Sequence, residues 1–470
     1  MEILRTNSPD WSPFVPVLPK EGPRPQALYA EVRRLIEEGA LPPGAKLPTT
    51  RDLAARFALS RGAVVAAYDM LVDDGFAEAR VGAGTFVAKA VPSLLADAVR
   101  GRTRPPEPKG PLPGVLGCST ADETTIRTFR TLLNRHLTRP SARHYHYGEP
   151  AGGEDLRIEI AAYLRSARGV RCEADQVIVT SGTQQAIDLV IRSVLKPGDA
   201  VWVEDPCYPM AKAAFAAAGM RLASVPVDGE GLDVQAGLQA APEARAVYVT
   251  PSHQFPLGVT LTMPRRLQLI DWARRTGAFI IEDDYDSEFR FSGPPLSSLQ
   301  GIDADGRVIY VGTFSKTLMP GFRIGYLVVP RAILDRVLAV RQLTDRFPST
   351  LFESALAEFL RDGHFASHVK RARRRVRAAR DGLVAALQEG GLAVAPPEQG
   401  LHLVAAVRAG HSEADVVRLA AEHGFGIRAL SPMYAGPGGR PGLVIGFSGF
   451  PAEVLAAAAR RFVEALRQAA

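Results

Sequence analysis

The stretch VGTFSKTLMPGFRIGY, residues 311–326, places one lysine among hydroxyl, glycine and arginine residues. A lysine amine attacks an aldehyde only when burial or cationic neighbours lower its pKa. Lys316 follows the apolar run VIYVGT, which is typical of a buried strand, so we expect its amine to be partly desolvated. Thr313 and Ser315 supply hydroxyls, and Arg323 supplies a planar fork suited to a phosphate. The spacing favours Schiff-base chemistry beside an anion site, although a lone lysine after a strand is usually a surface residue.

A second segment, SGTQQAID, follows the apolar run QVIVT and opens a predicted helix. Helix N-termini bind anions through free backbone N–H groups and the helix dipole. The residues at this turn are Ser181, Gly182, Thr183 and Gln184. Such a turn also occurs where it does no more than cap a helix, so the segment is weak evidence by itself.

Two further strand ends carry residues suited to a flat, nitrogen-containing ring. Asp283 and Tyr285 follow the strand FII, and a carboxylate there is costly unless it meets a partner such as a protonated pyridine nitrogen. Tyr208, in EDPCYP, offers a ring that could stack on a cofactor. Solvated loop acids and core packing are the ordinary alternatives. All these segments follow strands, and open α/β sheets place ligands at the carboxyl ends of their strands.

The elements that must position these residues are short apolar runs separated by helix-like segments. They lie at 176–180, 200–205, 246–250, 279–284, 308–313 and 325–330. Continuous apolar strands alternating with helices predict a mostly parallel sheet buried on both faces. Two long helical patterns after residue 331, followed by LHLVAAV and LVIGFS, predict a smaller α+β domain.

Residues 114–470 resemble the fold-type-I pyridoxal-phosphate (PLP) aminotransferases. The resemblance implies a mostly parallel seven-stranded sheet and assigns roles to the residues above. Lys316 would form the internal aldimine, Asp283 would pair with the pyridine nitrogen, Tyr285 would bond the ring hydroxyl, and Tyr208 would stack on the ring. The phosphate would be held by Gly182, Thr183, Ser315 and Arg323, with backbone help at Gln184, and Tyr147 of HYHYGEPAG would reach the phosphate of the other subunit. Ser181 and Thr313 would also bind the cofactor. PSHQFPLG, residues 251–258, resembles the loop beside the ring, but His253 and Gln254 receive no role.

The first ninety residues predict three helices and a hairpin. Leu28, Val32 and Ile36 form one helical stripe, and PPG then breaks the chain. Thr49 or Thr50 can cap a second helix, and Ser60 can cap a third. AEARVGAGTFVA then predicts two strands about a glycine turn.

This region resembles the winged helix-turn-helix of the GntR class. The resemblance implies DNA contacts from Lys46, Arg51, Ser60 and Arg61, with Gly82 and Gly84 shaping the wing. Because Ser60 would cap the recognition helix, Arg61 would lie in the turn that meets base edges and phosphates. The alternative is a small three-helix domain with surface arginines.

The two halves in this order resemble the MocR/GabR-type regulators, which are dimeric transcription factors. The resemblance implies a PLP cofactor, a double-stranded DNA operator, a homodimer and a small-molecule effector, namely an amine, an amino acid or a B6 vitamer. We expect residues 1–90 to bind DNA, 91–113 to be a proline-rich linker, 114–330 to bind PLP and 331–470 to form the small domain.

The sequence departs from ordinary aminotransferases where they bind a substrate carboxylate. Val444 occupies the position of the usual late-strand arginine, and Met210 stands where GabR-like proteins tend to carry another. Arg428 and Arg440 lie nearby in sequence. The loss of a bidentate clamp makes ordinary transamination less favourable. A working aminotransferase with a DNA-binding domain, and a DNA-binding dimer on a cofactor-free scaffold, remain as alternatives.

Bulk properties suit a multidomain globular protein. The chain has 470 residues, 46% hydrophobic and 23% charged, and a net charge of +6. The first 100 residues carry 12 Lys+Arg and 12 Asp+Glu, so DNA binding must depend on local placement rather than on total charge. Cys118, Cys172 and Cys207 form no disulfide or zinc pattern, which fits the cytoplasm. We expect no signal peptide and no membrane span.

One basic run has two explanations. KRARRRVRAARDGL, residues 370–383, distributes arginines around a predicted helix. The pattern is typical either of a solvated helix or of a secondary DNA contact.

Overall fold

The computed structural model describes residues 24–89, 110–141, 144–293, 296–407, 410–436 and 439–469. The chain divides into two compact units, Met1–Lys109 and Gly110–Ala470. Within the described residues, no helix is both long enough and apolar enough to cross a lipid bilayer.

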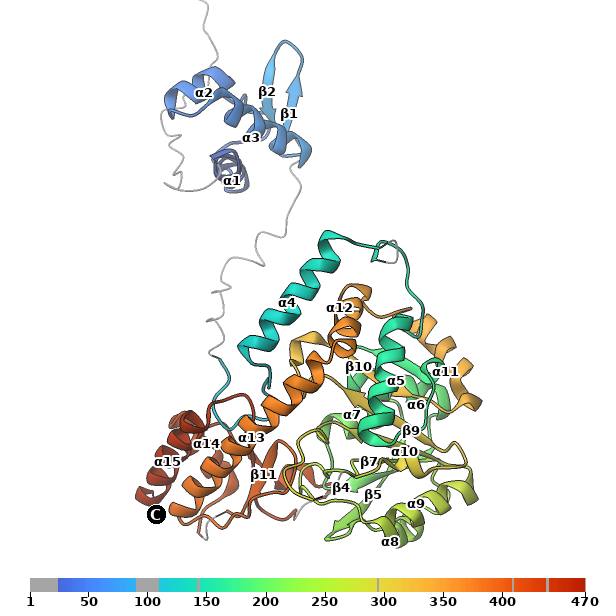
Figure 1. The fold of residues 1–470 in the computed structure, drawn as a ribbon. Coiled ribbons are helices and arrows are strands. Elements are labelled where there is room, and N and C mark those ends of the chain that lie inside the picture. The colour runs from blue at the N-terminus through green and yellow to red at the C-terminus, as the bar shows by residue number, and fades with distance from the viewer. Residues whose placement is uncertain are drawn as a thin grey trace, which may run out of the picture. The chain divides into compact units, whose positions relative to one another are not determined.

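Residues 24–89, the described part of the N-terminal unit, form three helices followed by an antiparallel hairpin, as expected (Figure 1). Its elements are α1 (Arg24–Glu37), α2 (Thr50–Arg56), α3 (Arg61–Asp73), β1 (Ala77–Arg80) and β2 (Gly84–Val87). The predicted caps are present: Thr49 Oγ1 accepts from the N–H of Asp52, and Ser60 Oγ accepts from the N–H of Ala63 at 3.1 Å. The predicted stripe on α1 is buried in the core of this unit. Thr49 and Ser60 therefore mark the N-terminal ends of α2 and α3.

The C-terminal unit is built on an eight-stranded sheet, visible in green and yellow in Figure 1. Its order is β3 (Val177–Thr180), β10 (Gly325–Val328), β9 (Val308–Thr313), β8 (Phe279–Asp284), β7 (Ala246–Val249), β4 (Ala200–Asp205), β5 (Arg221–Asp228) and β6 (Gly231–Leu232). The strands from β9 to β5 pair in parallel, whereas β10 is antiparallel to both neighbours.

The edge of this sheet differs from the sequence expectation. We expected seven strands, and the two-residue β6 adds an eighth, antiparallel to β5. The sequence did not single out β5, because all its side chains except that of Val225 are exposed or only half-buried. A half-exposed strand of this kind, second from the edge, lacks the continuous apolar run that marks a strand buried on both faces.

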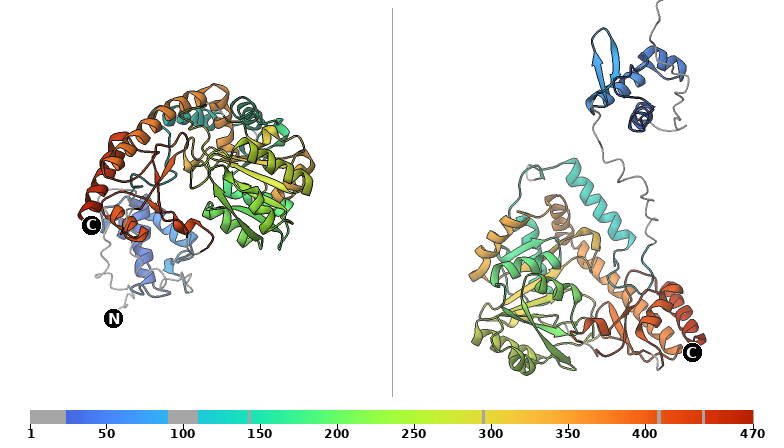
Figure 2. Two further views of the ribbon diagram at one scale, coloured as in Figure 1. Left: turned by 90° about the horizontal axis from the view of Figure 1, so that it is seen from below. Right: turned by 180° about the vertical axis from the view of Figure 1, so that it is seen from behind.

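Helices cover both faces of the sheet (Figure 2). Those that follow or precede its strands are α4 (Glu123–Thr138), α5 (Glu154–Arg168), α6 (Thr183–Val194), α7 (Pro209–Ala217), α8 (Val234–Ala240), α9 (Met263–Thr276) and α10 (Leu299–Ile302). On one side Ile187 of α6 and Phe215 of α7 belong to the same buried apolar cluster as Ile309 of β9. On the other side Trp272 of α9 stacks on Trp202 of β4, with ring centroids 4.1 Å apart.

The C-terminal part adds three helices rather than the two long helical patterns expected after residue 331. These are α11 (Arg331–Thr344), α12 (Thr350–Arg361) and α13 (His364–Glu389). Arg346, with φ 67°, lies between the first two, and Gly363, with φ 74°, lies between α12 and α13. Left-handed backbone at both points separates the helices. A three-stranded antiparallel sheet follows, in the order β11 (His402–Ala405), β13 (Leu443–Gly446) and β12 (Arg428–Ala429), with α14 (Glu413–Glu422) and α15 (Ala452–Gln468).

Candidate functional site

A cavity of about 170 Å³ collects all but two of the predicted cofactor residues. Those that line it are Gly182, Thr183, Gln184, Tyr208, Asp283, Tyr285, Thr313, Ser315, Lys316 and Arg323. They come from the ends of β3, β4, β8 and β9, from the residues just before β10, and from the beginning of α6. The fold therefore brings these segments together at the carboxyl ends of the parallel strands, where ligands bind in open α/β sheets.

Lys316 lies on the turn that follows β9, and its side chain lines the cavity. Burial lowers the pKa of the Lys316 amine, while the charges of Asp286 and Asp283 act in the opposite direction. A Cβ on Gly117, whose φ is 79°, would lie 2.7 Å from Lys316 Nζ. The close approach of this glycine leaves space for the amine, which is partly desolvated and suited to attack a carbonyl carbon.

Asp283 has one satisfied and one unsatisfied oxygen. The hydroxyl of Tyr248 donates to Oδ2 at 2.6 Å, whereas buried Oδ1 has no hydrogen-bond partner among the described residues. Burial raises the pKa of Asp283 to about 7, and the bond from Tyr248 and the charge of Lys316 oppose that shift. A buried carboxylate oxygen without a donor is costly, so the site is suited to a cationic N–H group in the cavity.

An anion cup lies at the start of α6. Gly182, with φ 111°, is the N-cap and contributes no side-chain cap, so the first N–H groups of α6 lack an intrahelical acceptor. A Cβ on Gly182 would lie 3.6 Å from Nη1 of Arg323, which itself has the left-handed φ of 51°. Among the residues the structure describes, no carboxylate lies within ion-pair distance of Arg323. The N-terminus of α6 and the guanidinium of Arg323 together are suited to bind a phosphate.

Two predicted cofactor residues do not line this cavity. Ser181, whose N–H donates to Oε1 of Gln185 at 2.6 Å, is not among the residues that line the cavity. Tyr147 is 76% exposed, with the guanidinium of Arg346 4.2 Å from its ring centroid and the ring of Phe347 at 5.8 Å. Its expected role was toward the phosphate of the other subunit, and that role stays a prediction.

The loop at 251–258 contributes Phe255 to the cavity wall and holds the residues beside it. Tyr285 donates its hydroxyl to the main-chain oxygen of His253 at 2.9 Å, and His253 Nδ1 lies 2.9 Å from Asp286. Gln254 donates to the main-chain oxygen of Pro206 at 2.8 Å, joining this loop to the end of β4. These contacts give both loop residues a structural role that the sequence did not assign.

Further lining residues received no individual role from the sequence, although Phe255 lies in the loop that was expected beside the ring. They are Leu116, Gly117, Tyr248, Thr250, Phe255, Leu401 and His402. The pairs Leu116–Gly117 and Leu401–His402 lie far from the motifs in sequence and carry no recognisable local pattern. Burial lowers the pKa of His402 well below its usual range, so its imidazole is neutral in the cavity wall.

The structure shows the surroundings of the two positions where relatives carry a carboxylate-binding arginine, and of the two arginines nearby in sequence. Val444 is buried in β13, and Met210 is 52% exposed. Arg428 of β12 pairs in register with Val444, is exposed, and its charge helps to lower the pKa of Lys316. Arg428 therefore acts on the cavity, whereas Arg440 acts on Tyr434.

The predicted DNA-contact residues gather at the N-terminal ends of α2 and α3 and at the hairpin. Arg51 and Arg61 are exposed in the first turns of these helices. Lys46 forms a bridge with Phe86 of β2, and Gly82 and Gly84 have φ of 73° and 107° at the hairpin turn. Ion pairs in the described part of this unit involve Arg33, Arg34 and Arg80, leaving the cations of Lys46, Arg51 and Arg61 available to phosphates.

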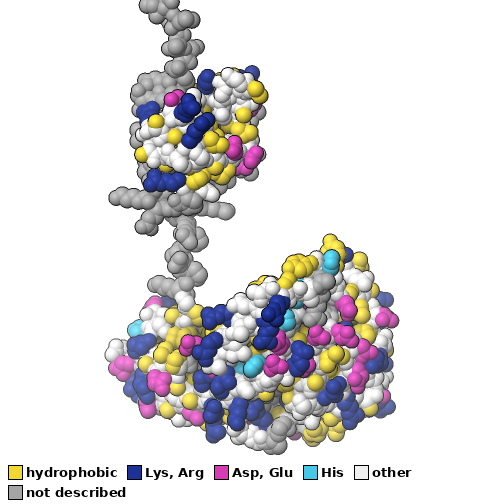
Figure 3. Space-filling view, turned by 45° about the horizontal axis from the view of Figure 1, so that its top comes forward, with side chains coloured by type: hydrophobic (Ala, Val, Ile, Leu, Met, Phe, Trp, Pro, Cys, Tyr) yellow, Lys and Arg dark blue, Asp and Glu magenta, His cyan; other side chains and the backbone are white. Residues whose placement is uncertain are grey.

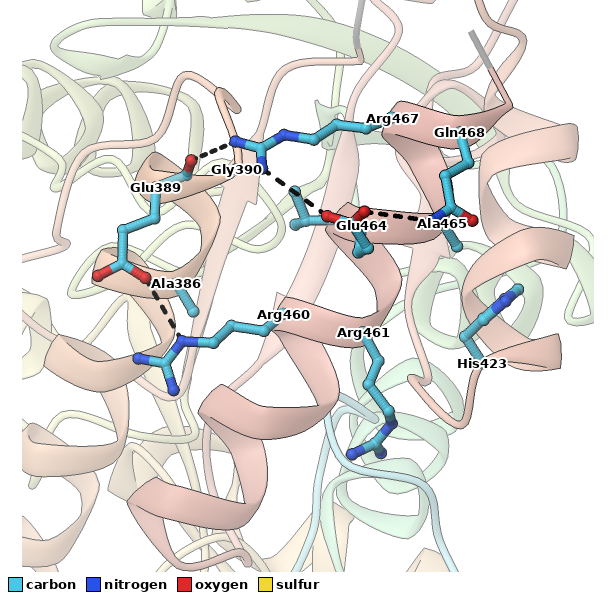
Figure 4. Close-up of a pocket in the computed structure, with 11 residues that line it drawn as sticks. Ala386, Glu389, Gly390, His423, Arg460, Arg461, Glu464, Ala465, Arg467 and Gln468 are labelled. Carbon is cyan, nitrogen blue, oxygen red and sulfur yellow. Dashed lines mark hydrogen bonds and ion pairs between the residues drawn. The ribbon is translucent and has the colours of Figure 1, made fainter.

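A larger cavity, of about 560 Å³, lies between α13 and α15 (Figure 4). Figure 4 shows Glu389 between Arg460 and Arg467, with an ion pair and a hydrogen bond linking them across the two helices. It contains none of the predicted site residues. The chemistry predicted from the sequence therefore belongs to the smaller cavity.

Comparison with protein families agrees with both units. Residues 25–87 match the family "Bacterial regulatory proteins, gntR family", and residues 129–462 match "Aminotransferase class I and II". The α-aminoadipate aminotransferase LysN from Thermus thermophilus, solved with N-(5'-phosphopyridoxyl)-L-leucine, has a similar structure. Its TM-score is 0.68 at 27% identity, covering 75% of this chain and 91% of LysN.

Relatives that match nearly the whole chain combine the two parts. The probable rhizopine catabolism regulatory protein MocR of Rhizobium meliloti is 35% identical, covering 95% of this chain and 94% of the relative. The HTH-type pyridoxine biosynthesis transcriptional regulator PdxR of Corynebacterium glutamicum is 32% identical, covering 92% and 93%. With a GntR-type helix-turn-helix unit followed by an aminotransferase class I and II fold, the chain belongs to the MocR-type family of transcriptional regulators.

Proposed function

We propose that this chain is a PLP-binding transcriptional regulator that responds to a small amine, amino acid or B6 vitamer. The observation that carries the proposal is the unpartnered Oδ1 of Asp283, buried in the same cavity as the amine of Lys316. A scaffold with no cofactor has no use for this costly arrangement. A pyridinium nitrogen resolves it.

The residues of the cavity fit each part of PLP. Once bound, PLP supplies an aldehyde carbon to an amine and an electron-withdrawing ring. Lys316 would bind the aldehyde carbon, Asp283 would accept from the ring nitrogen, and Tyr208 would cover the ring. The phosphate would be held by Gly182, Thr183, Gln184, Thr313, Ser315 and Arg323, with Ser181 adjoining them in the chain. Tyr285 would bond the ring hydroxyl through its phenol oxygen, its own position being held by the hydrogen bond to the main-chain oxygen of His253.

The effector would compete for the carbon that Lys316 holds. An effector with an amine would displace Lys316, whereas free PLP would act simply by filling the site. The relative PdxR is named for pyridoxine biosynthesis and MocR for rhizopine catabolism, so named roles differ within the family. With Val444 and Met210 at the usual arginine positions, we propose that sustained transamination is not the function.

The N-terminal unit would read an operator in double-stranded DNA. Ser60 orients the first turn of α3, which presents Arg61 to base edges and phosphates, while Arg51 and Lys46 contact phosphates. Gly82 and Gly84 would let the wing follow the minor groove. We propose that the protein works as a homodimer in the cytoplasm, with Tyr147 reaching the partner's phosphate and with two DNA-reading heads at a defined half-site spacing.

We propose a separate function for each segment of the chain. Residues 1–90 would bind DNA, 114–330 would bind PLP and 331–470 would cover the cofactor, with 91–113 as the linker.

An active aminotransferase is the second candidate, favoured by the lowered pKa of Lys316. Purified protein should carry the visible absorbance of bound PLP and should bind DNA from upstream of its own gene. Sustained conversion of amino donors to keto acids at ordinary enzyme rates would favour the aminotransferase instead.

A further inference from the structure

Helix α13 carries the basic run at residues 370–380, and the structure separates its cations into two groups. The first group holds the helix to the rest of the unit. Arg371 and Arg375 both bind the carboxylate of Asp122, at 2.8 and 2.7 Å. Arg373 donates to the main-chain oxygen of Glu288 at 2.9 Å, and Arg380 donates to that of Pro397. These arginines are explained by packing.

The second group consists of Lys370, Arg374 and Arg377, which we term the α13 basic face. All three side chains are exposed, and among the described residues none has a hydrogen-bond acceptor or a carboxylate within bonding distance. Their spacing of four and three residues puts them on one side of the helix. The opposite side, at His368, Ala372 and Ala379, is buried.

The α13 basic face is not neutralised by its own helix. Like charges four residues apart, as at Lys370 and Arg374, destabilise a helix in water. The nearest acid along the same face is Asp381, which pairs with Arg380 rather than with Arg377. Figure 3 shows Lys and Arg side chains gathered on the surface of the C-terminal unit. An external polyanion would remove this repulsion.

The length of the face suits a nucleic-acid backbone. From Lys370 to Arg377 the helix rises about 10 Å, at roughly 1.5 Å per residue. Phosphates of one DNA strand follow one another about every 3.4 Å along the duplex axis. Three cations over about 10 Å therefore match about three consecutive phosphates of one strand.

We propose that the α13 basic face is a second DNA contact, which binds phosphates without reading sequence. The proposal rests on the proposed DNA-binding function and adds a surface in the aminotransferase-like unit. Helix α13 is also connected to the cofactor cavity, because His368 on its buried side contacts the main-chain oxygen of Thr317, next to Lys316. Phosphates on this face would thus contact a helix anchored to the cofactor loop.

The test measures DNA affinity of the full-length protein against KCl concentration. The probes are a duplex from directly upstream of the gene and a random-sequence duplex of equal length. The variant combines Lys370→Gln, Arg374→Gln and Arg377→Gln. Its control combines Arg274→Gln, Arg275→Gln and Arg418→Gln, which removes the same charge from side chains that are 55%, 59% and 68% exposed on α9 and α14.

The expected result is a shallower salt dependence for the α13 variant alone. Each lost phosphate contact reduces the slope of log K against log [salt] by about 0.9, so three contacts reduce it by about 2.7, on both probes. A slope equal to that of the control overturns the proposal. 

An Arg61→Ala variant distinguishes DNA binding by the winged helix from DNA binding by the α13 basic face. Loss of binding there with an unchanged α13 variant leaves the winged helix standing and removes the second contact. The reverse pattern removes the winged helix as the main reader. If the unmodified protein binds neither duplex at low salt, both proposals fall.

Discussion

His368 Nε2 on α13 lies 2.6 Å from the main-chain oxygen of Thr317, the residue that follows Lys316. Because that oxygen can only accept, Nε2 carries the proton and Nδ1 accepts from the hydroxyl of Thr125 at 2.8 Å. Burial lowers the pKa of His368, which keeps this neutral tautomer. Helix α13 is thereby attached to the loop that holds the cavity lysine.

Replacement of His368 by alanine should loosen that attachment. The change leaves the hydroxyl of Thr125 with one bond fewer, and the main-chain oxygen of Thr317 keeps its bond from Thr120. A lost buried hydrogen bond costs about 1–3 kcal/mol of unfolding free energy. Urea denaturation and PLP titration should show both lower stability and weaker PLP binding. A loss of stability with unchanged PLP affinity would mean that α13 is attached to the fold but not to the cofactor loop.

Protonation of His368 should weaken the fold on the acid side. Its pKa is lowered in the folded state, so below the unfolded value of about 6.5 the unfolded chain binds more protons and stability falls as the pH falls. His402 acts in the same direction. Comparing the urea midpoints of the unmodified protein and a His368→Gln variant between about pH 5 and about pH 7 isolates this contribution. Parallel pH profiles would show that His368 does not titrate on unfolding.

Asp283→Asn should separate stability from cofactor binding. Burial raises the pKa of Asp283 to about 7, so its ionisation opposes folding above neutral pH. Asparagine removes this cost and should stabilise the cofactor-free protein by roughly 1–4 kcal/mol in mildly alkaline buffer. The same change should weaken PLP binding, because the ring nitrogen loses its anionic partner. Asp381→Asn, on the exposed surface, is the control. If Asp283→Asn bound PLP as tightly as the unmodified protein, Asp283 would not face the ring nitrogen.

Gly117→Ala should block the amine without unfolding the chain. The new methyl carbon would lie 2.7 Å from Lys316 Nζ, and a left-handed φ costs a non-glycine residue about 1–2 kcal/mol. We expect a modest fall in melting temperature and a large loss of covalent PLP attachment. Visible absorbance measures the attachment. Gly410→Ala is a matched control, since Gly410 also has positive φ but nothing within 4 Å of its Cβ. Equal PLP attachment in the two variants would show that Gly117 does not shape the site.

Covalent attachment of PLP should respond to pH through Lys316. Only the neutral amine attacks a carbonyl, and burial lowers the pKa of Lys316 below the usual 10.5. The attachment rate of cofactor-free protein should therefore rise with pH and level off below pH 10.5. Stopped-flow absorbance measures it. A rate that still increases above that pH would indicate an exposed lysine of ordinary pKa.

The chemistry of the site was predictable where it depends on local pattern. Lys316 lies on the turn after β9, Asp283 lies in the last part of β8, and the carboxyl ends of parallel strands meet at one edge. Gly117 and His402 were not predictable, because distant segments bring them into the cavity. Strand β5, next to the edge strand β6, was missed because half-exposed strands lack an apolar run. The arginines of α13 divided into paired and unpaired groups only once their partners were known, since Asp122 lies far away in sequence.

The central claim is that PLP binds covalently to Lys316, and peptide mass mapping after borohydride reduction tests it most directly. Protein incubated with PLP, reduced and digested should carry a single phosphopyridoxyl group on the peptide containing Lys316. A Lys316→Ala variant should carry none there while still binding DNA. An unmodified Lys316 in saturated protein, or a label spread over surface lysines only, would contradict the account.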